Sequence, residues 1–102
     1  MIERELTPEA TQKLVDSGAA SLVDVRRDDE WQEARIPGAG HLPLDRLAAR
    51  AAELDRSRPV VFYCRVGERS LLAADACRAS GIEAASMAGG IQLWRAEGRP
   101  TE

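Results

Sequence analysis

The stretch Pro59-Val60-Val61-Phe62-Tyr63-Cys64 decides the fold class of this chain. It is apolar up to its last residue and rich in β-branched and aromatic side chains, which is typical of a central strand buried on both faces of a parallel sheet. On both sides of this stretch, short apolar runs alternate with helical patterns. This alternation indicates βαβ units, so we expect an α/β domain with a parallel sheet.

Caps, turn residues and apolar runs predict the other elements. We expect strands at residues 2–6, 21–25, 41–44 and 82–87, with the strand at 41–44 at a sheet edge because it contains a proline. We expect helices from the N-cap Thr7 to Gly18, over 28–34, from the cap Asp45 through 54, over 70–80 and over 91–97.

The composition fits one domain, residues 1–102, because the chain is too short for two. Hydrophobic residues make up 44% and aromatic residues only 4%, so the core must be mainly aliphatic. No apolar run approaches the ~20 residues of a membrane span, and the charged residues 1–5 lack an export signal. We therefore expect a cytoplasmic protein without a membrane partner. The net charge of −3 and the pI near 5.2 argue against nucleic acid as a partner.

The segment Cys64-Arg65-Val66-Gly67-Glu68-Arg69-Ser70 carries the candidate chemistry, because ligands bind beyond the carboxyl ends of strands in α/β sheets. Backbone N–H groups of this loop can form an anion nest around the Cys64 sulfur, with Gly67 supplying a positive φ. The N-terminus of the next helix, Arg65 and Arg69 add positive charge. All these effects favour the thiolate, which is the nucleophilic form of cysteine.

The alternative is that Cys64 acts only as a small buried hydrophobic residue, and Glu68 favours it slightly because a carboxylate opposes the anion field. His41 is the single histidine and hence the only imidazole base available, but a structural or surface role suits its predicted edge strand better. Cys77 lies ~10 Å along the predicted helix from Ser70. A disulfide needs Cα atoms within ~7 Å, so we expect Cys77 to be buried on the helix face.

Four motifs occur in order between residues 22 and 100. The first two are Leu22-Val23-Asp24-Val25-Arg26 with Glu30-Trp31, and Arg35-Ile36-Pro37-Gly38-Ala39 with His41-Leu42-Pro43. The last two are the loop 64–70, and Met87-Ala88-Gly89-Gly90-Ile91 with Trp94, Gly98 and Pro100. Together they resemble the signatures of the single-domain rhodaneses, sulfurtransferases that carry sulfur as a cysteine persulfide. The resemblance implies a rhodanese-like fold, with a five-stranded parallel sheet flanked by helices on both faces.

The resemblance also implies that Cys64 takes sulfur from thiosulfate or a related donor and passes it to cyanide or a thiol. No metal and no organic cofactor are required. Thioredoxin-like or sulfur-relay proteins are candidate partners. The expected substrate-binding residues are those of the loop: Arg65, Val66, Gly67, Glu68, Arg69 and Ser70.

Several roles stay open at this point. Asp24 is expected to anchor either the loop backbone or Arg26, and Arg26 is either its ion-pair partner or a solvated arginine. Arg69 either binds the anionic donor or clamps the loop. We interpret residues 28–30 as a solvated, acidic helix start. We interpret Trp94 as core, and residues 89–90 as a turn that approaches the active loop closely.

The chain departs from the family pattern at one pair of residues. The family usually has Gly-His where this chain has Ala34-Arg35, which concerns local packing more than activity.

The length of the loop separates two related chemistries. Cysteine phosphatases hold phosphate in a longer loop, with an arginine six residues after the cysteine, whereas Arg69 lies five residues after Cys64. The tighter ring favours a sulfane sulfur over phosphate. The alternatives are a cysteine phosphatase or arsenate reductase on the same fold, and a non-catalytic rhodanese-like module that docks a partner protein.

Overall fold

A computed structural model describes residues 2–102; Met1, the first residue of the charged N-terminal segment, lies outside them. None of the helices in residues 2–102 has the length and apolar character needed to cross a membrane. The elements are β1 (Glu5–Leu6), α1 (Pro8–Asp16), β2 (Ser21–Asp24), α2 (Asp28–Glu33), β3 (Gly40–His41), α3 (Leu44–Arg50), a 3₁₀ turn (Ala51–Glu53), β4 (Val60–Tyr63), α4 (Glu68–Ala79), β5 (Ala84–Met87) and α5 (Gly90–Ala96).

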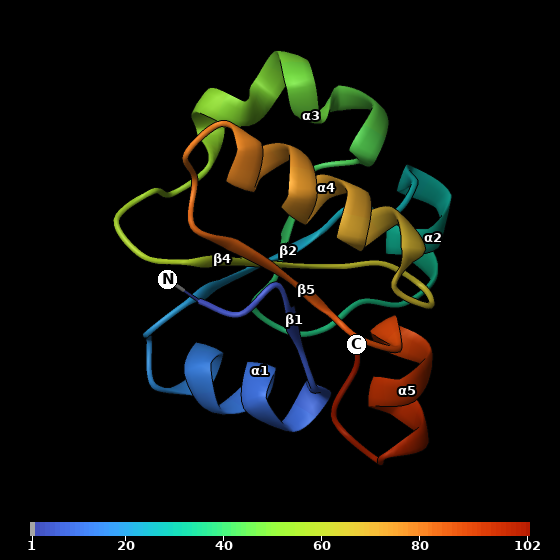
Figure 1. The fold of residues 1–102 in the computed structure, drawn as a ribbon. Helices are drawn as coiled ribbons and strands as arrows, with labels where there is room; N and C mark the ends of the chain where they lie inside the picture. Colours follow the sequence, from blue (N-terminus) through green and yellow to red (C-terminus); the bar gives the residue numbers. More distant parts are fainter. Residues whose placement is uncertain (1) are drawn as a thin grey trace.

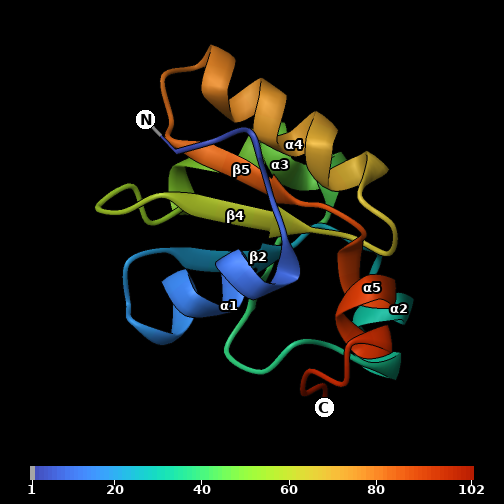
Figure 2. The same cartoon turned by 60° about the horizontal axis from the view of Figure 1, so that its bottom comes forward.

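The five strands form one parallel sheet, as the resemblance implied, and their order is β1-β5-β4-β2-β3. Strand β4 lies at its centre, and all four of its residues are 0% exposed. Because side chains alternate along a strand, Val60 and Phe62 face α3 and α4, whereas Val61 and Tyr63 face α1 and α5. Figures 1 and 2 show these two helix pairs on opposite faces of the sheet, so the predicted covering of both faces is confirmed.

The helix that follows Cys64 begins two residues earlier than predicted. Helix α4 starts at Glu68 and not at Ser70, because Gly67 is its N-cap with a φ of +110°. Glycine adopts this conformation readily, since it has no Cβ to clash with the backbone. The connection from β4 to α4 is therefore shorter than expected, and Ser70 belongs to the first turn of the helix.

The prediction for residues 41–54 is correct in the type of element but wrong in its boundaries. Strand β3 lies at the sheet edge as expected, but it ends at His41 because Pro43 is already the N-cap of α3. Helix α3 starts at Leu44, so Asp45 lies in its first turn and does not cap it. The α-helical part ends at Arg50 and continues as the 3₁₀ turn, short of the predicted end at 54.

The sheet register brings the loops of the candidate site together. Asp24 at the end of β2 pairs with Tyr63 at the end of β4, and Phe62 pairs with Ser86 of β5. Because the strands are parallel, their carboxyl ends share one edge of the sheet. Cys64, the loop after β2 and the turn after β5 therefore meet at this edge, where α2, α4 and α5 begin (Figure 2).

Candidate active site

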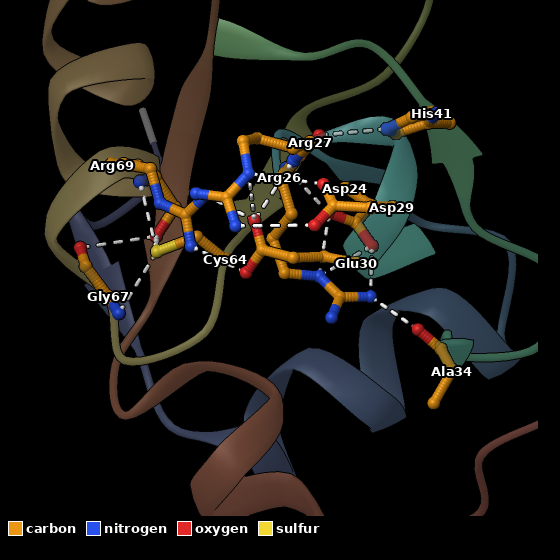
Figure 3. Close-up of polar contacts among 11 residues, drawn as sticks. Asp24, Arg26, Arg27, Asp29, Glu30, Ala34, His41, Cys64, Gly67 and Arg69 are labelled. Atoms are coloured by element: carbon orange, nitrogen blue, oxygen red, sulfur yellow. Dashed lines mark hydrogen bonds and ion pairs between the residues drawn. The ribbon is translucent and has the colours of Figure 1, made fainter. Parts of the chain in front are cut away.

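Cys64 lies at the carboxyl end of β4, where its sulfur accepts hydrogen bonds from the first turn of α4. The thiol is 1% exposed. The backbone N–H group of Gly67 donates to Sγ over 3.1 Å (Figure 3). The backbone N–H group of Ser70 donates to it over 3.4 Å. Burial raises the pKa of Cys64, but the hydrogen bonds from the Ser70 side chain and from the N–H groups of Ser70, Gly67 and Val66 outweigh it and lower the pKa below its ordinary value. The structure thus favours a thiolate, as the sequence predicted from the anion nest.

A pair of buried hydroxyl groups extends this arrangement behind the sulfur. Ser70 Oγ lies 3.5 Å from Cys64 Sγ, 3.2 Å from the Gly67 carbonyl oxygen and 2.7 Å from Ser86 Oγ. Ser86 belongs to β5 and is 1% exposed, and within residues 2–102 its hydroxyl has no other side-chain partner. Its proton therefore goes to Ser70 Oγ, which leaves the Ser70 proton for the sulfur or for Gly67. The sequence analysis did not identify Ser86.

The turn between β5 and α5 holds the active loop by its backbone. The N–H groups of Ile91 and Gln92 donate to the carbonyl oxygens of Cys64 and Arg65 over 2.9 and 3.1 Å. A Cβ at Gly90 would overlap both of these carbonyl oxygens, so only glycine fits here. The close approach that we expected from residues 89–90 is confirmed.

Asp24 and Arg26 form a buried ion pair beside the loop. Asp24 is 0% and Arg26 5% exposed. The Asp24 carboxylate accepts the Arg26 backbone N–H at 2.8 Å and its guanidinium at 2.8–3.1 Å, and Arg26 Nη2 also donates to the Ala34 carbonyl at 2.5 Å. Of the open roles, the structure therefore shows the pairing of Asp24 with Arg26, and Arg26 is not a solvated arginine.

Arg69 points back across the site and binds Glu30 of α2. Two hydrogen bonds of 2.6 and 3.0 Å join its guanidinium to the carboxylate (Figure 3). The Arg69 side chain hydrogen bond, countered in part by burial, lowers the pKa of Glu30 to about 2. The Glu30 side chain is only 14% exposed, so the interpretation of Glu30 as part of a solvated helix start is wrong. Its place beside Trp31 in the first motif was the available signal.

Three residues of the loop have side chains that face solvent and make no hydrogen bond to the sulfur. Arg65, Val66 and Glu68 are exposed, Val66 by 43%. Arg65 makes no ion pair within residues 2–102. These side chains therefore form the outer rim of the candidate site, above the buried sulfur.

His41 and Cys77 have the structural positions that we expected. His41 Nε2 lies 2.8 Å from the Arg26 carbonyl oxygen, and its ring stacks on Trp31 at 4.6 Å. The Arg35 guanidinium also lies over the Trp31 ring, 4.8 Å from its centroid. Arg35, which stands where the family usually has histidine, therefore has a packing role. Cys77 lies on the buried face of α4, in the core, and burial raises its pKa. Within residues 2–102, no three His, Cys, Asp or Glu side chains are grouped to hold a metal ion.

The sequence is similar to one family model and to proteins of several organisms. Residues 7–97 match the model of the rhodanese-like domain. A sulfurtransferase of Allochromatium vinosum is 35% identical over 91 residues, which cover 88% of this chain and 85% of that protein. An HTH-type transcriptional regulator of Mycobacterium tuberculosis is 40% identical over 90 residues, which cover 85% of this chain but only 39% of the regulator. The chain thus spans most of the first relative and less than half of the second.

Solved structures share the whole fold. A rhodanese-related protein from Thermoplasma volcanium has a TM-score of 0.91 and 25% identity, and the match covers 98% of both chains. A protein of unknown function from Rhodopseudomonas palustris, described as a possible tyrosine phosphatase, has a TM-score of 0.85 and 30% identity. That match covers 97% of this chain and 84% of the other.

Proposed function

The chain belongs to the rhodanese-like family, and from this premise we propose that it is a sulfurtransferase that carries sulfane sulfur as a persulfide on Cys64. One observation carries the proposal: two backbone N–H groups point at a buried sulfur and lower its pKa. A merely structural cysteine has no need of such donors. We propose the cytoplasm as its location, because transfer through free thiols needs a reducing compartment.

In the first half-reaction, the Cys64 thiolate attacks the outer sulfur of thiosulfate or a related donor. The S–S bond of thiosulfate breaks, its electron pair leaves with sulfite, and the outer sulfur stays on Cys64 as a persulfide. The N–H groups of Gly67 and Ser70 stabilise the negative charge on the sulfur. Arg65, exposed at the rim, attracts the dianion, whereas Arg69 holds α2 against the loop through Glu30.

In the second half-reaction, cyanide or a thiolate attacks the outer sulfur of the persulfide. The bond between the two sulfurs breaks, and its electron pair returns to Cys64 as the thiolate. No metal or organic cofactor enters either step of the proposal. In a cell, a thioredoxin-like or sulfur-relay protein is a candidate acceptor.

A second candidate function is phosphate-ester hydrolysis, which the likeness to the possible tyrosine phosphatase favours. Against it stands the loop, in which Arg69 is five residues from Cys64 and already bound to Glu30. Its guanidinium is therefore not directed at an anion above the sulfur. The third candidate is a module that binds a partner protein without catalysis.

The mass of the intact protein after thiosulfate treatment tests the proposal. We expect a gain of one sulfur, ~32 Da, for the wild type and for Cys77→Ser, and no gain for Cys64→Ser. Sulfur on Cys77 alone would refute the assignment of the site. Hydrolysis of p-nitrophenyl phosphate without sulfur loading would establish the phosphatase, and the absence of both activities would favour the binding module.

A further inference from the structure

A groove of about 520 Å³ runs between α2 and α5 and opens beside the active loop. Figure 2 shows the two helices next to each other at the edge of the sheet where the loop lies. One wall carries the carboxylates of α2, Asp29, Glu30 and Glu33, together with Arg26 and Arg27, which are already paired with Asp24 and Asp29. The other wall is basic and polar and carries Arg65, Gln92 and Arg95 from the loop and α5.

The two walls differ in which charges are already compensated. On the α2 wall, Asp29 is paired with Arg27 and Glu30 with Arg69. Glu33 is exposed and makes no ion pair within the described part of the chain. On the opposite wall, Arg65 and Arg95 are both exposed, and neither makes an ion pair within residues 2–102. The groove therefore offers two uncompensated positive charges opposite one negative charge.

We propose that this groove binds the sulfur acceptor, and that the acceptor is a small thiol that carries both a carboxylate and an ammonium group. Arg95 and Arg65 bind the carboxylate, and Glu33 binds the ammonium group. This inference rests on the proposed sulfurtransferase function. A dianionic donor such as thiosulfate has no positive group for the acidic wall, and it fills only a small part of the groove.

The position of Arg95 connects the groove to the reacting sulfur. The Gln92 N–H donates to the carbonyl oxygen of Arg65, the residue after Cys64, so the first turn of α5 lies against the loop. Arg95 follows three residues later on the same helix face, ~4.5 Å further along the axis. The proposal places the carboxylate there, with the thiol of the same molecule directed along the groove toward the loop that holds Cys64.

The two half-reactions can share the rim because they occur in sequence. Sulfite leaves before the acceptor enters, so Arg65 can meet the donor first and the acceptor carboxylate later. The bound thiol, as its thiolate, attacks the outer sulfur of the Cys64 persulfide. The S–S bond to Cys64 breaks, Cys64 leaves as a thiolate, and the acceptor becomes a persulfide. No oxidant or reductant is needed, because the sulfur is only exchanged.

Four thiols that differ in charge test the proposal on protein already loaded with sulfur, as verified by intact mass. They are cysteine, 3-mercaptopropionate, cysteamine and 2-mercaptoethanol, and the rate constant for unloading is measured for each. For Arg95→Gln, we expect the rate constant to fall about tenfold with the two thiols that carry a carboxylate, cysteine and 3-mercaptopropionate, as for a lost charge-assisted hydrogen bond. It should fall less than twofold with cysteamine and 2-mercaptoethanol. For Glu33→Gln, we expect it to fall only with the two thiols that carry an ammonium group, cysteine and cysteamine.

Control variants and the sulfur-loading step distinguish a failure of the groove proposal from a failure of the proposed function. Arg56→Gln and Glu3→Gln remove exposed charges that do not line the groove, and we expect neither to change the order of the four thiols. If Arg95→Gln changes all four rate constants equally, the groove does not select by charge and the inference is wrong. If the wild type takes up no sulfur at all, the proposed function itself fails, independently of the groove.

Discussion

At Cys64, the environment of a single sulfur atom combines two opposing effects. Burial raises the pKa of the thiol, while hydrogen bonds from the start of α4 lower it and prevail. The sequence predicted the backbone donors because Gly67 and a helix start follow the cysteine within six residues. It could not predict the hydroxyl of Ser86, because the contact depends on the register of β4 with β5, 16 residues beyond Ser70.

We predict that Ser86→Ala raises the pKa of Cys64. Without the Ser86 proton, the Ser70 hydroxyl is a weaker donor to the sulfur, since chains of hydrogen bonds polarise one another. Ser70→Ala should raise the pKa further, because it removes the donor itself. The pH dependence of Cys64 alkylation by iodoacetamide, followed by peptide mass spectrometry, gives the pKa.

Thr11→Val serves as the control for this experiment. Thr11 is 0% exposed, its hydroxyl has no hydrogen-bond partner within residues 2–102, and α1 lies away from the loop. We expect the Cys64 titration to be unchanged in this variant. An unchanged titration in Ser86→Ala as well would show that Ser86 does not position Ser70, and a wild-type midpoint at or above ~8.5 would exclude an activated thiolate.

At the scale of elements, two of the three helices that begin at the site, α4 and α5, are capped by glycines. Both Gly67 and Gly89 are N-caps with positive φ, of +110° and +77°. The sequence predicted every strand and helix in the right order, because apolar runs and caps are local signals. It placed the starts of both α3 and α4 two residues too late, because neighbouring strands and turns decide where the backbone enters a helix.

We predict that Gly90→Ala destabilises the protein by about 3 kcal/mol or more and impairs sulfur loading. The new Cβ would overlap the carbonyl oxygens of Cys64 and Arg65, which are backbone atoms and cannot move aside, and a φ of +56° adds strain. Gly81→Ala is the matched control, because φ there is +83° but nothing lies within 4 Å of the new Cβ. It should cost only about 1–2 kcal/mol and leave loading intact. Urea unfolding and intact mass measure both effects; equal costs at both sites would contradict the predicted overlap.

Across the whole molecule, the sheet brings together groups that are far apart in sequence. Asp24, Cys64 and the turn after β5 were expected at one edge, because the carboxyl ends of parallel strands meet there. The ion pair of Glu30 with Arg69 spans 39 residues, and neither spacing nor charge pattern identified it. Three acidic residues at a helix start have the same pattern whether they are solvated or paired, so only the packing of α2 against the loop distinguishes Glu30 from its neighbours.

We predict that this ion pair makes the stability of the protein acid-sensitive. Because the folded-state pKa of Glu30 is lowered to about 2, its contribution is fully present above pH ~4.5 and is lost as the pH falls toward 2. At neutral pH we expect Glu30→Gln to lower the free energy of unfolding by about 2–3 kcal/mol. Between pH 4.5 and 2 the variant should lose less stability than the wild type, as measured by urea unfolding at each pH.

Glu53→Gln provides the comparison for this prediction. Glu53 pairs with Arg50 at 2.8 Å, but both side chains are about half exposed, so the pair is screened by solvent. We expect this variant to follow the stability of the wild type closely at every pH. If both variants had the same acid profile as the wild type, the partly buried pair of Glu30 with Arg69 would not be the source of the acid sensitivity.

The backbone hydrogen bonds from α5 to the active loop make two amide groups reporters of how often the loop opens. The N–H groups of Ile91 and Gln92 are held by the carbonyl oxygens of Cys64 and Arg65, and they can exchange their hydrogen for deuterium only when helix and loop separate. Their exchange rates therefore record how often the chain around the reactive sulfur opens. An opening seen at these two amides but not in strand β4 is local, and one shared with β4 is the unfolding of the entire protein.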